Sequence, residues 1–295
     1  MEWNLQNPRK QTALDGEPYD RWITPQGVCM AEFYRKASID GGQGYLVRFP
    51  GQADFTIQNP GDTEVEIFCH PVPEHDPAQT SNLFHNQILP ILGNHAGGLF
   101  LHGSAVRMSD VEGSKNNGAV AFLGLSRGGK TTLAGSFAKA GFAFLTEDVI
   151  DLRHRDGKYW LQPKRSKLRL FADSAQHLLG PGAQFDDDNR KQDVEAGEAL
   201  PFAKNAEPLR QIYILGTDHG APLSIRRLGM SEALSALLPH AFILDVEDKT
   251  RLRGHFSRMA DLSQDISCYA LDYRREYAEL PRVQEAVLSN LRSEH

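Results

Sequence analysis

Short apolar runs broken by turn residues fill the first part of the chain, and this pattern is typical of β-strands. A Gly-Gly pair and the triplets Phe-Pro-Gly and Asn-Pro-Gly separate the runs. We predict strands at residues 28–35, 44–49, 54–58 and 64–70. Residues 78–93 then show an apolar stripe with helical spacing, which Pro90 interrupts. The pattern predicts a small β-rich N-terminal module with a linking helix, over residues 1–96.

Beyond residue 96, short apolar runs alternate with amphipathic stretches, as in an α/β fold. Strands are predicted at residues 99–107, 119–123, 142–146, 149–152, 159–162, 167–171, 209–215, 222–228 and 268–273. Helices are predicted at residues 132–140, 231–238, 250–262 and 280–291. The runs 142–146 and 149–152 look like one strand that continues past two acidic residues. Residues 97–295 are therefore expected to form a second domain.

A long irregular segment, residues 180–208, carries many acidic side chains, among them Asp186, Asp187 and Asp188. Loops of this length in compact domains are usually functional or disordered. The acids have no partner histidine and lack the glycine-defined spacing of a calcium loop. We interpret the segment as a solvated insertion rather than a metal site.

The most specific motif follows the predicted strand 119–123, where the sequence reads Gly-Leu-Ser-Arg-Gly-Gly-Lys-Thr. A Gly-x-x-x-x-Gly-Lys-Thr pattern between a buried strand and a helix is that of a phosphate-binding P-loop. The backbone N–H groups of such a turn and the positive end of the helix converge on phosphate oxygens. Lys130 is expected to reach the β- and γ-phosphates, and the Thr131 hydroxyl to bind Mg²⁺. The predicted nucleotide-binding residues are Gly124, Ser126, Arg127, Gly128, Gly129, Lys130, Thr131 and Thr132.

Two adjacent acids, Glu147 and Asp148, lie 17 and 18 residues after Lys130. A simple βαβ unit would place them at the carboxyl end of the neighbouring strand, which is the edge that faces ligands. Packing explains such a pair poorly because neighbouring carboxylates repel each other. A kinase needs one carboxylate to accept a hydroxyl proton and another near Mg²⁺, and this pair meets that need. His102, on the strand before the loop strand, is either a structural or a catalytic histidine.

Composition narrows the class of protein further. The net charge of −6, from 32 basic and 38 acidic residues, offers no basic footprint for nucleic acid. No run approaches the roughly 18 apolar residues that span a bilayer, and the N-terminus lacks the apolar core of a signal peptide. The three cysteines are widely spaced and read as reduced thiols. We expect a cytoplasmic protein without a nucleic-acid or membrane partner.

Three segments together resemble the signatures of the HPr serine kinase/phosphorylase catalytic domain. They are His102-Gly103, the loop 124–131 and the run Leu-Thr-Glu-Asp at 145–148. That family has a His-Gly before the loop strand, a Gly-x-Ser-Gly-x-Gly-Lys-Ser loop, and an Asp-Asp pair one helix and strand later. Residues 47–55, 101–106 and 168–170 extend the likeness to HPr-kinase-related proteins encoded among modified-peptide, notably lasso-peptide, gene sets. Some of these are peptide serine kinases.

The resemblance implies an α/β fold with a P-loop core of the kind shared by HPr kinase and phosphoenolpyruvate carboxykinase. By position, Glu147 matches the general base, Asp148 its neighbour near the metal, and His102 the histidine that supports the base. ATP and Mg²⁺ are the implied cofactors, and a serine of a peptide or protein, such as a ribosomally made precursor, is the implied acceptor. A homo-oligomer is also implied.

The chain departs from the family at three places. Glu147 stands where the family has Asp, and Arg127 replaces the first inner glycine of the loop, where it either stiffens the turn or stabilises transferred phosphate. The basic run 164–169 replaces the Glu-x-x-Gly-Leu-Gly segment of the bifunctional enzymes, so the likeness does not extend to phosphorolysis or to HPr as the acceptor. That run is either a solvated strand face or an anion site, with Arg169 the best candidate. A small-molecule kinase and a regulatory nucleotide-binding protein remain alternatives.

Overall fold

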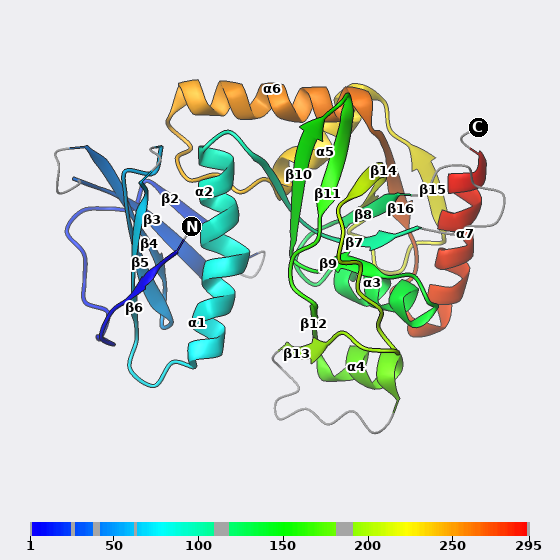
Figure 1. Cartoon of the computed structure of the whole chain (residues 1–295), viewed down its shortest axis with the longest axis horizontal. Coiled ribbons are helices and arrows are strands. Elements are labelled where there is room, and N and C mark those ends of the chain that lie inside the picture. The colour runs from blue at the N-terminus through cyan, green and yellow to red at the C-terminus, as the bar shows by residue number, and fades with distance from the viewer. Residues whose placement is uncertain are drawn as a thin grey trace. The chain divides into compact units, whose positions relative to one another are not determined.

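A computed structural model describes residues 2–24, 27–37, 42–61, 64–108, 118–180 and 191–293 of the chain. It divides into two compact units (Figure 1). The first comprises Met1–Gly98 and Phe242–His255, and the second comprises Leu99–Ala241 and Phe256–His295. The hydrophobic pattern carries no sign that a segment near residue 242 returns to the first unit. Residues 181–190, which include the acidic run Asp186 to Asp188, lie outside the described residues.

The first unit is built on a six-stranded sheet in the order β1-β6-β5-β4-β3-β2. The strands are β1 (Asn4–Leu5), β2 (Asp20–Ile23), β3 (Cys29–Ala37), β4 (Gln43–Phe49), β5 (Ala53–Gln58) and β6 (Glu66–Pro71). β1 pairs with β6 in parallel, and the other neighbours are antiparallel. Turns at the Phe-Pro-Gly and Asn-Pro-Gly sites separate β4, β5 and β6, as the turn chemistry predicted, whereas the Gly-Gly site falls partly outside the described residues.

One helical stretch, made of three consecutive parts, follows this sheet. It consists of α1 (Pro77–Leu83), the π-helical turn η1 (Phe84–Ile88) and α2 (Leu89–His95). Asp76 caps its start by accepting the backbone N–H of Ala78 at 2.8 Å. Pro90 does not end the helix, because it lies just after the π-helical turn η1, where the regular i→i−4 bonding is already shifted. Phe84 stacks on Trp3, with ring centroids 5.1 Å apart, and anchors the helix to the sheet.

A buried carboxylate, that of Asp245, is the main charged tie between the returning segment and the rest of the first unit, and its side chain is 2% exposed. Arg35 donates to it through Nε at 3.1 Å and Nη2 at 2.6 Å, and the Tyr45 hydroxyl donates at 2.8 Å. The backbone N–H of Glu247 also donates to Asp245, at 2.9 Å. A buried carboxylate with this many donors holds the segment in one conformation.

The second unit is built on an eight-stranded mixed sheet in which β11-β10-β7-β8-β14-β16-β15 follow one another and β9 pairs with β7. Its strands are β7 (Leu99–Arg107), β8 (Ala119–Leu123), β9 (Phe144–Thr146), β10 (Val149–Arg155), β11 (Lys158–Gln162), β14 (Glu207–Leu215), β15 (Ser224–Arg227) and β16 (Ser267–Asp272). A separate ribbon pairs β12 (Lys167–Leu170) with β13 (Gln192–Glu195). The expected mixture of strands and helices is therefore present.

Helices cover both faces of this sheet, and β8 shows how its sequence serves two cores. Val120 and Phe122 pack on one side with α3 (Lys130–Lys139) and α7 (Leu280–Ser293). Ala119, Ala121 and Leu123 pack on the other side with α5 (Met230–Leu237) and the end of α6 (Lys249–Asp265). This period of two on a strand buried on both faces explains why β8 is wholly apolar.

Two predicted features of this unit are wrong. The run predicted as one strand over 142–152 is two strands, β9 and β10, which separate at the acid pair. The segment between β12 and β13 begins with an unpredicted helix, α4 (Ala172–Leu179), and β13 lies within residues predicted to be irregular. Two short 3-10 turns, η2 (Leu238–His240) and η3 (Tyr277–Glu279), complete the unit. No helix of the described residues is long and apolar enough to cross a bilayer.

Candidate active site

The glycine-rich loop 124–131 joins β8 to α3 in a tight left-handed turn. Gly129 precedes the helix with φ of 89°, and Arg127 also adopts a positive φ, 61°. Gly129 suits this conformation at no steric cost, whereas Arg127 pays for it with strain. The guanidinium of Arg127 lies 5.4 Å from the centre of the Phe171 ring, and this contact helps to hold it there. The replacement of glycine by Arg127 therefore does not prevent the turn.

Lys130 folds back onto its own loop. Its ammonium donates to the carbonyl oxygens of Gly124 at 2.8 Å and Leu125 at 3.0 Å. Burial, and then the charge of Lys191, lowers the pKa of Lys130 to about 8. Lys130 is only 6% exposed, and the two carbonyl dipoles hold its charge close to the turn.

Arg275, which the sequence analysis missed, ties the loop to two strand ends. Its guanidinium donates to the carbonyl oxygens of Gly128 at 3.1 Å, Gly216 at 2.8 Å and Tyr273 at 2.7 Å. It also lies 3.8 Å from the centre of the Tyr273 ring. Three fixed acceptors match the planar fork of an arginine and not the single ammonium of a lysine. A lone arginine 147 residues from Gly128 gives no sequence signal of this role.

The acid pair reaches the loop through β7 rather than through the simple βαβ neighbour that we predicted. β7 lies between β8 and β9 and is antiparallel to both. Its Gly103 N–H donates to the Asp148 carbonyl at 3.2 Å, and its Ser104 hydroxyl donates to the Glu147 carbonyl. These bonds fix the turn between β9 and β10 at the same sheet edge as the loop, where parallel strand ends meet.

Close packing at Gly103 makes this arrangement possible. A Cβ at that position would lie 2.4 Å from Leu123 Cδ2 and 2.6 Å from Ile150 Cδ1. Any larger residue would push β7 away from β8 or β10. The His-Gly of the sequence motif therefore has a packing reason for its glycine.

Glu147 and Thr131 meet directly. The Thr131 hydroxyl donates to Glu147 Oε1 at 3.0 Å, and both residues are buried. This bond joins the first turn of α3 to the acid pair. The predicted base and the predicted metal-binding hydroxyl are thus in contact.

Two cations surround the acids. Lys191, just before β13, places its ammonium 2.8 Å from Glu147 Oε1 and 3.8 Å from Asp148 Oδ1. Arg169, on β12, places Nη1 3.4 Å from Asp148 Oδ2 and Nε 3.7 Å from Asp193 Oδ1. Arg169 therefore lies at the site, where its guanidinium pairs with carboxylates rather than facing an open anion site. Lys191 belongs to the segment predicted to be a solvated insertion, and its role was not predicted.

Their surroundings shift the pKa values of the two acids in opposite directions. Removal from water, and then the charge of Asp148, raises the pKa of the Glu147 carboxyl to about 7. Burial alone would also raise the pKa of Asp148, but the nearby cations, Lys191 first, hold it below its usual value. Asp148 is therefore ionised at neutral pH, while Glu147 is poised to exchange a proton there.

His102 lies on β7 opposite Val149, directly beside the acid turn. Burial, and then the charge of Lys130, lowers its pKa to about 3. A second histidine, His240 in η2, has its pKa lowered to about 4 by burial and by Lys130. His102 is a neutral imidazole at neutral pH, so it can support a base by hydrogen bonding but not by positive charge.

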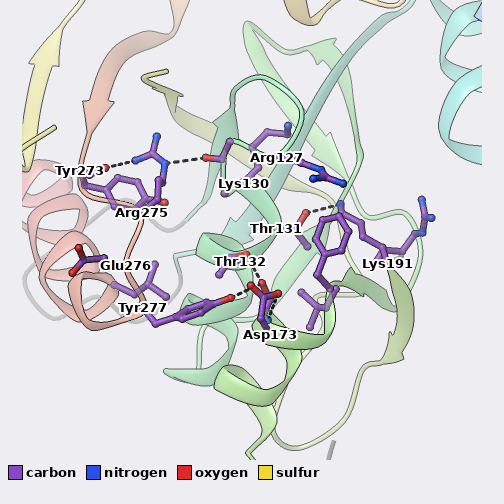
Figure 2. Close-up of a pocket in the computed structure, with 17 residues that line it drawn as sticks. Arg127, Lys130, Thr131, Thr132, Asp173, Lys191, Tyr273, Arg275, Glu276 and Tyr277 are labelled. Atoms are coloured by element: carbon purple, nitrogen blue, oxygen red, sulfur yellow. Dashed lines mark hydrogen bonds between the residues drawn. The ribbon is translucent and has the colours of Figure 1, made fainter. Parts of the chain in front are cut away.

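A pocket of about 390 Å³ opens against the first turn of α3 (Figure 2). Arg127, Lys130, Thr131 and Thr132 form one side of its lining, with Arg169 and Lys191 beside them. Tyr273, Arg275, Glu276, Tyr277 and Leu280 also line it, as do residues at the end of β12 and the start of α4. Figure 2 shows Tyr273, Arg275 and Tyr277 on the opposite side from Lys191. The pocket has the size of a nucleotide site and combines aromatic walls with cations.

The oxygen donors at the acid turn fit Mg²⁺. That ion usually takes one or two carboxylates and completes its shell with water and substrate phosphate. Thr131, Glu147 and Asp148 offer a hydroxyl and two carboxylates within one corner. The described residues contain no group of three or more His, Cys, Asp or Glu side chains suited to a metal. A hydroxyl and two carboxylates would hold an ion whose remaining ligands come from water and phosphate.

No model of a known protein family matches the chain, and neither does any curated protein. Among solved structures, the chain is similar to the HPr(Ser) kinase/phosphatase from Coxiella burnetii. The similarity covers 67% of this chain and 99% of that one, at 12% sequence identity and a TM-score of 0.35. With so low a TM-score, we infer the function of this chain from its own residues.

Proposed function

We propose that this chain is an ATP- and Mg²⁺-dependent kinase that phosphorylates a hydroxyl group, with a serine of a peptide or protein as the acceptor. The observation that carries the proposal is the 3.0 Å hydrogen bond from Thr131 to Glu147. It unites a phosphate-binding turn with a carboxylate whose pKa, raised to about 7 by burial, suits a general base. A phosphate-binding turn alone needs no such carboxylate.

In this mechanism the backbone N–H groups of Gly128 to Thr131 and the start of α3 bind the phosphates. Lys130 turns from its loop carbonyls to the γ-phosphate and stabilises the charge that develops there. Thr131 and Asp148 would hold Mg²⁺, which when bound neutralises phosphate charge.

Glu147 accepts the proton of the acceptor hydroxyl as its oxygen attacks the γ-phosphate in line. The neutral His102 supports this turn as a hydrogen-bonding group. The serine acceptor is inferred from the motif likeness alone, whereas the hydroxyl chemistry is also supported by the position of Glu147.

Radiolabelled ATP with Mg²⁺ tests this function, using serine peptides, small hydroxyl compounds and no acceptor as parallel arms. Lys130→Ala should weaken nucleotide binding, whereas Glu147→Gln should bind nucleotide as wild type does and lose transfer by about 10²–10⁴-fold. Lys139→Ala, at the exposed end of α3, is the matched lysine control. If nucleotide binds, no acceptor is phosphorylated in any arm, and Glu147→Gln is indistinguishable from wild type, the chain is not a kinase.

A further inference from the structure

Lys191 contacts all three oxygen-bearing side chains of the acid corner. Its ammonium lies 2.8 Å from Glu147 Oε1, 3.3 Å from Thr131 Oγ1 and 3.8 Å from Asp148 Oδ1. These are the hydroxyl and the two carboxylates to which the proposed mechanism assigns the metal and the base. No other part of the mechanism uses Lys191.

The surroundings of Lys191 show that this contact is built into the fold. Its side chain is 26% exposed, and the two carboxylates that it contacts are 5% and 11% exposed. The next residue, Gln192, begins β13, whose pairing with β12 sets Arg169 opposite Asp193. The ribbon thereby delivers Lys191 and Arg169 to the acids together, and the two positive charges match two negative ones.

We propose that Lys191 is an internal stand-in for the divalent cation, which it excludes from the acid corner until a magnesium nucleotide displaces it. This regulation rests on the proposed function for its biological meaning, since it concerns the same site. The ammonium and the ion require the same oxygens and repel each other, so they do not occupy the corner together. Asp148 keeps a cation beside it in either state, which avoids leaving this buried charge unpaired.

A nucleotide supplies a new negative partner for Lys191 when metal displaces it from the acids, and metal alone supplies none. Lys191 lines the same pocket as Arg127 and Lys130, so an ammonium released from the acids meets phosphate without leaving that pocket. Metal arriving with phosphate therefore compensates both partners of the broken ion pairs. Metal arriving alone compensates the carboxylates and leaves Lys191 without its counter-charge. We therefore expect the protein to bind metal tightly only when nucleotide is also bound.

The test measures Mn²⁺ affinity by electron paramagnetic resonance, first with Mn²⁺ alone and then with a non-hydrolysable ATP analogue. Lys191→Ala should bind Mn²⁺ alone at least about tenfold more tightly than wild type, which corresponds to about 1.4 kcal/mol. The further gain on adding nucleotide should be smaller in this variant. Lys191→Arg, which keeps the charge, should behave like wild type.

Lys167→Ala is the matched control, because Lys167 lies on the same ribbon, is 33% exposed and pairs with Asp193 and Glu195 instead. It should leave Mn²⁺ affinity unchanged. Equal or weaker Mn²⁺ binding by folded Lys191→Ala, including no binding by either protein, overturns the role of Lys191. Because the readout is metal affinity, it is separate from phosphoryl transfer. If the wild-type chain fails the kinase assay and Lys191→Ala still binds Mn²⁺ more tightly, the results refute the proposed function but support the role of Lys191 as a stand-in for the cation.

Discussion

Arg275 is the side chain on which the shape of the glycine-rich loop most depends, and its removal should weaken nucleotide binding. In Arg275→Ala the carbonyls of Gly128, Gly216 and Tyr273 lose their donor. A hydrogen bond from a charged group contributes about 1.5–3 kcal/mol. The bond to Gly128 is the one that acts on the loop. At the lower end of that range, its loss predicts about tenfold weaker binding of an ATP analogue.

The cost to folding should be larger than the cost to binding, because all three bonds and the contact with the Tyr273 ring disappear together. Arg275 is half-buried, so water replaces part of what is lost. We expect the free energy of unfolding to fall by about 2–4 kcal/mol. Arg275→Lys should fall between wild type and Arg275→Ala, since one ammonium does not reproduce the three-way fork.

A fluorescent ATP analogue gives the dissociation constants, and urea unfolding gives the free energies. Arg282→Ala is the control, because this arginine is 69% exposed, pairs with Glu279 at 3.0 Å and does not line the pocket. An Arg275→Ala protein with the nucleotide affinity and the unfolding midpoint of wild type would refute the reasoning. Lost stability with unchanged affinity would show that the loop keeps its shape without Arg275.

Three further predictions concern folding. Asp245→Ala should lower the free energy of unfolding by about 2–4 kcal/mol in urea, since Arg35 and the buried Tyr45 hydroxyl lose this acceptor. Glu247→Ala, at an exposed partner of Arg35, should change it by less than about 1 kcal/mol. Burial, and then the charge of Arg251, lowers the pKa of His95 to about 4, so the unfolded state binds more protons than the folded state below pH 6.5. The free energy of unfolding should therefore fall as the pH drops from 6.5 towards 4, and His95→Gln should make this fall less steep. Gly103→Ala should cost about 1–3 kcal/mol by crowding β7, and unchanged thermal unfolding would argue against that crowding.

Local chemistry made much of the fold predictable. Pro-Gly turns separate β4, β5 and β6, and β7 and β8 match the predicted bounds, β8 because its apolar run is uninterrupted. The break between β9 and β10 was hidden, since apolar residues flank the run Thr146 to Asp148 on both sides. It is set by pairing with β7 and by the Thr146 hydroxyl, which donates to the Val149 carbonyl at 2.6 Å. α4 escaped prediction because it is short and has no side-chain cap at Phe171.

The candidate site was predictable to the extent that its residues form motifs. The loop and the acid pair have a local spacing that the chemistry favours, whereas His102 was suggested by the family resemblance, and the structure brings Thr131 and Glu147 into contact. Lys191 and Arg275 are single cations whose roles arise from distant partners, 44 residues away for Lys191 and Glu147. Only tertiary structure assembles such pairs. Sequence patterns alone do not distinguish them from surface charges.

The return of residues 242–255 to the first unit has a consequence for synthesis. Arg35 and Asp245 are separated by 210 positions, so the first unit begins at the start of the chain and is completed only near its end. At about 5–20 residues per second, Arg35 waits roughly 10–40 s on the ribosome for its carboxylate. During that time the sheet of the first unit is present without its last piece. The first unit is thus completed only after residues 99–241 of the second unit have been made.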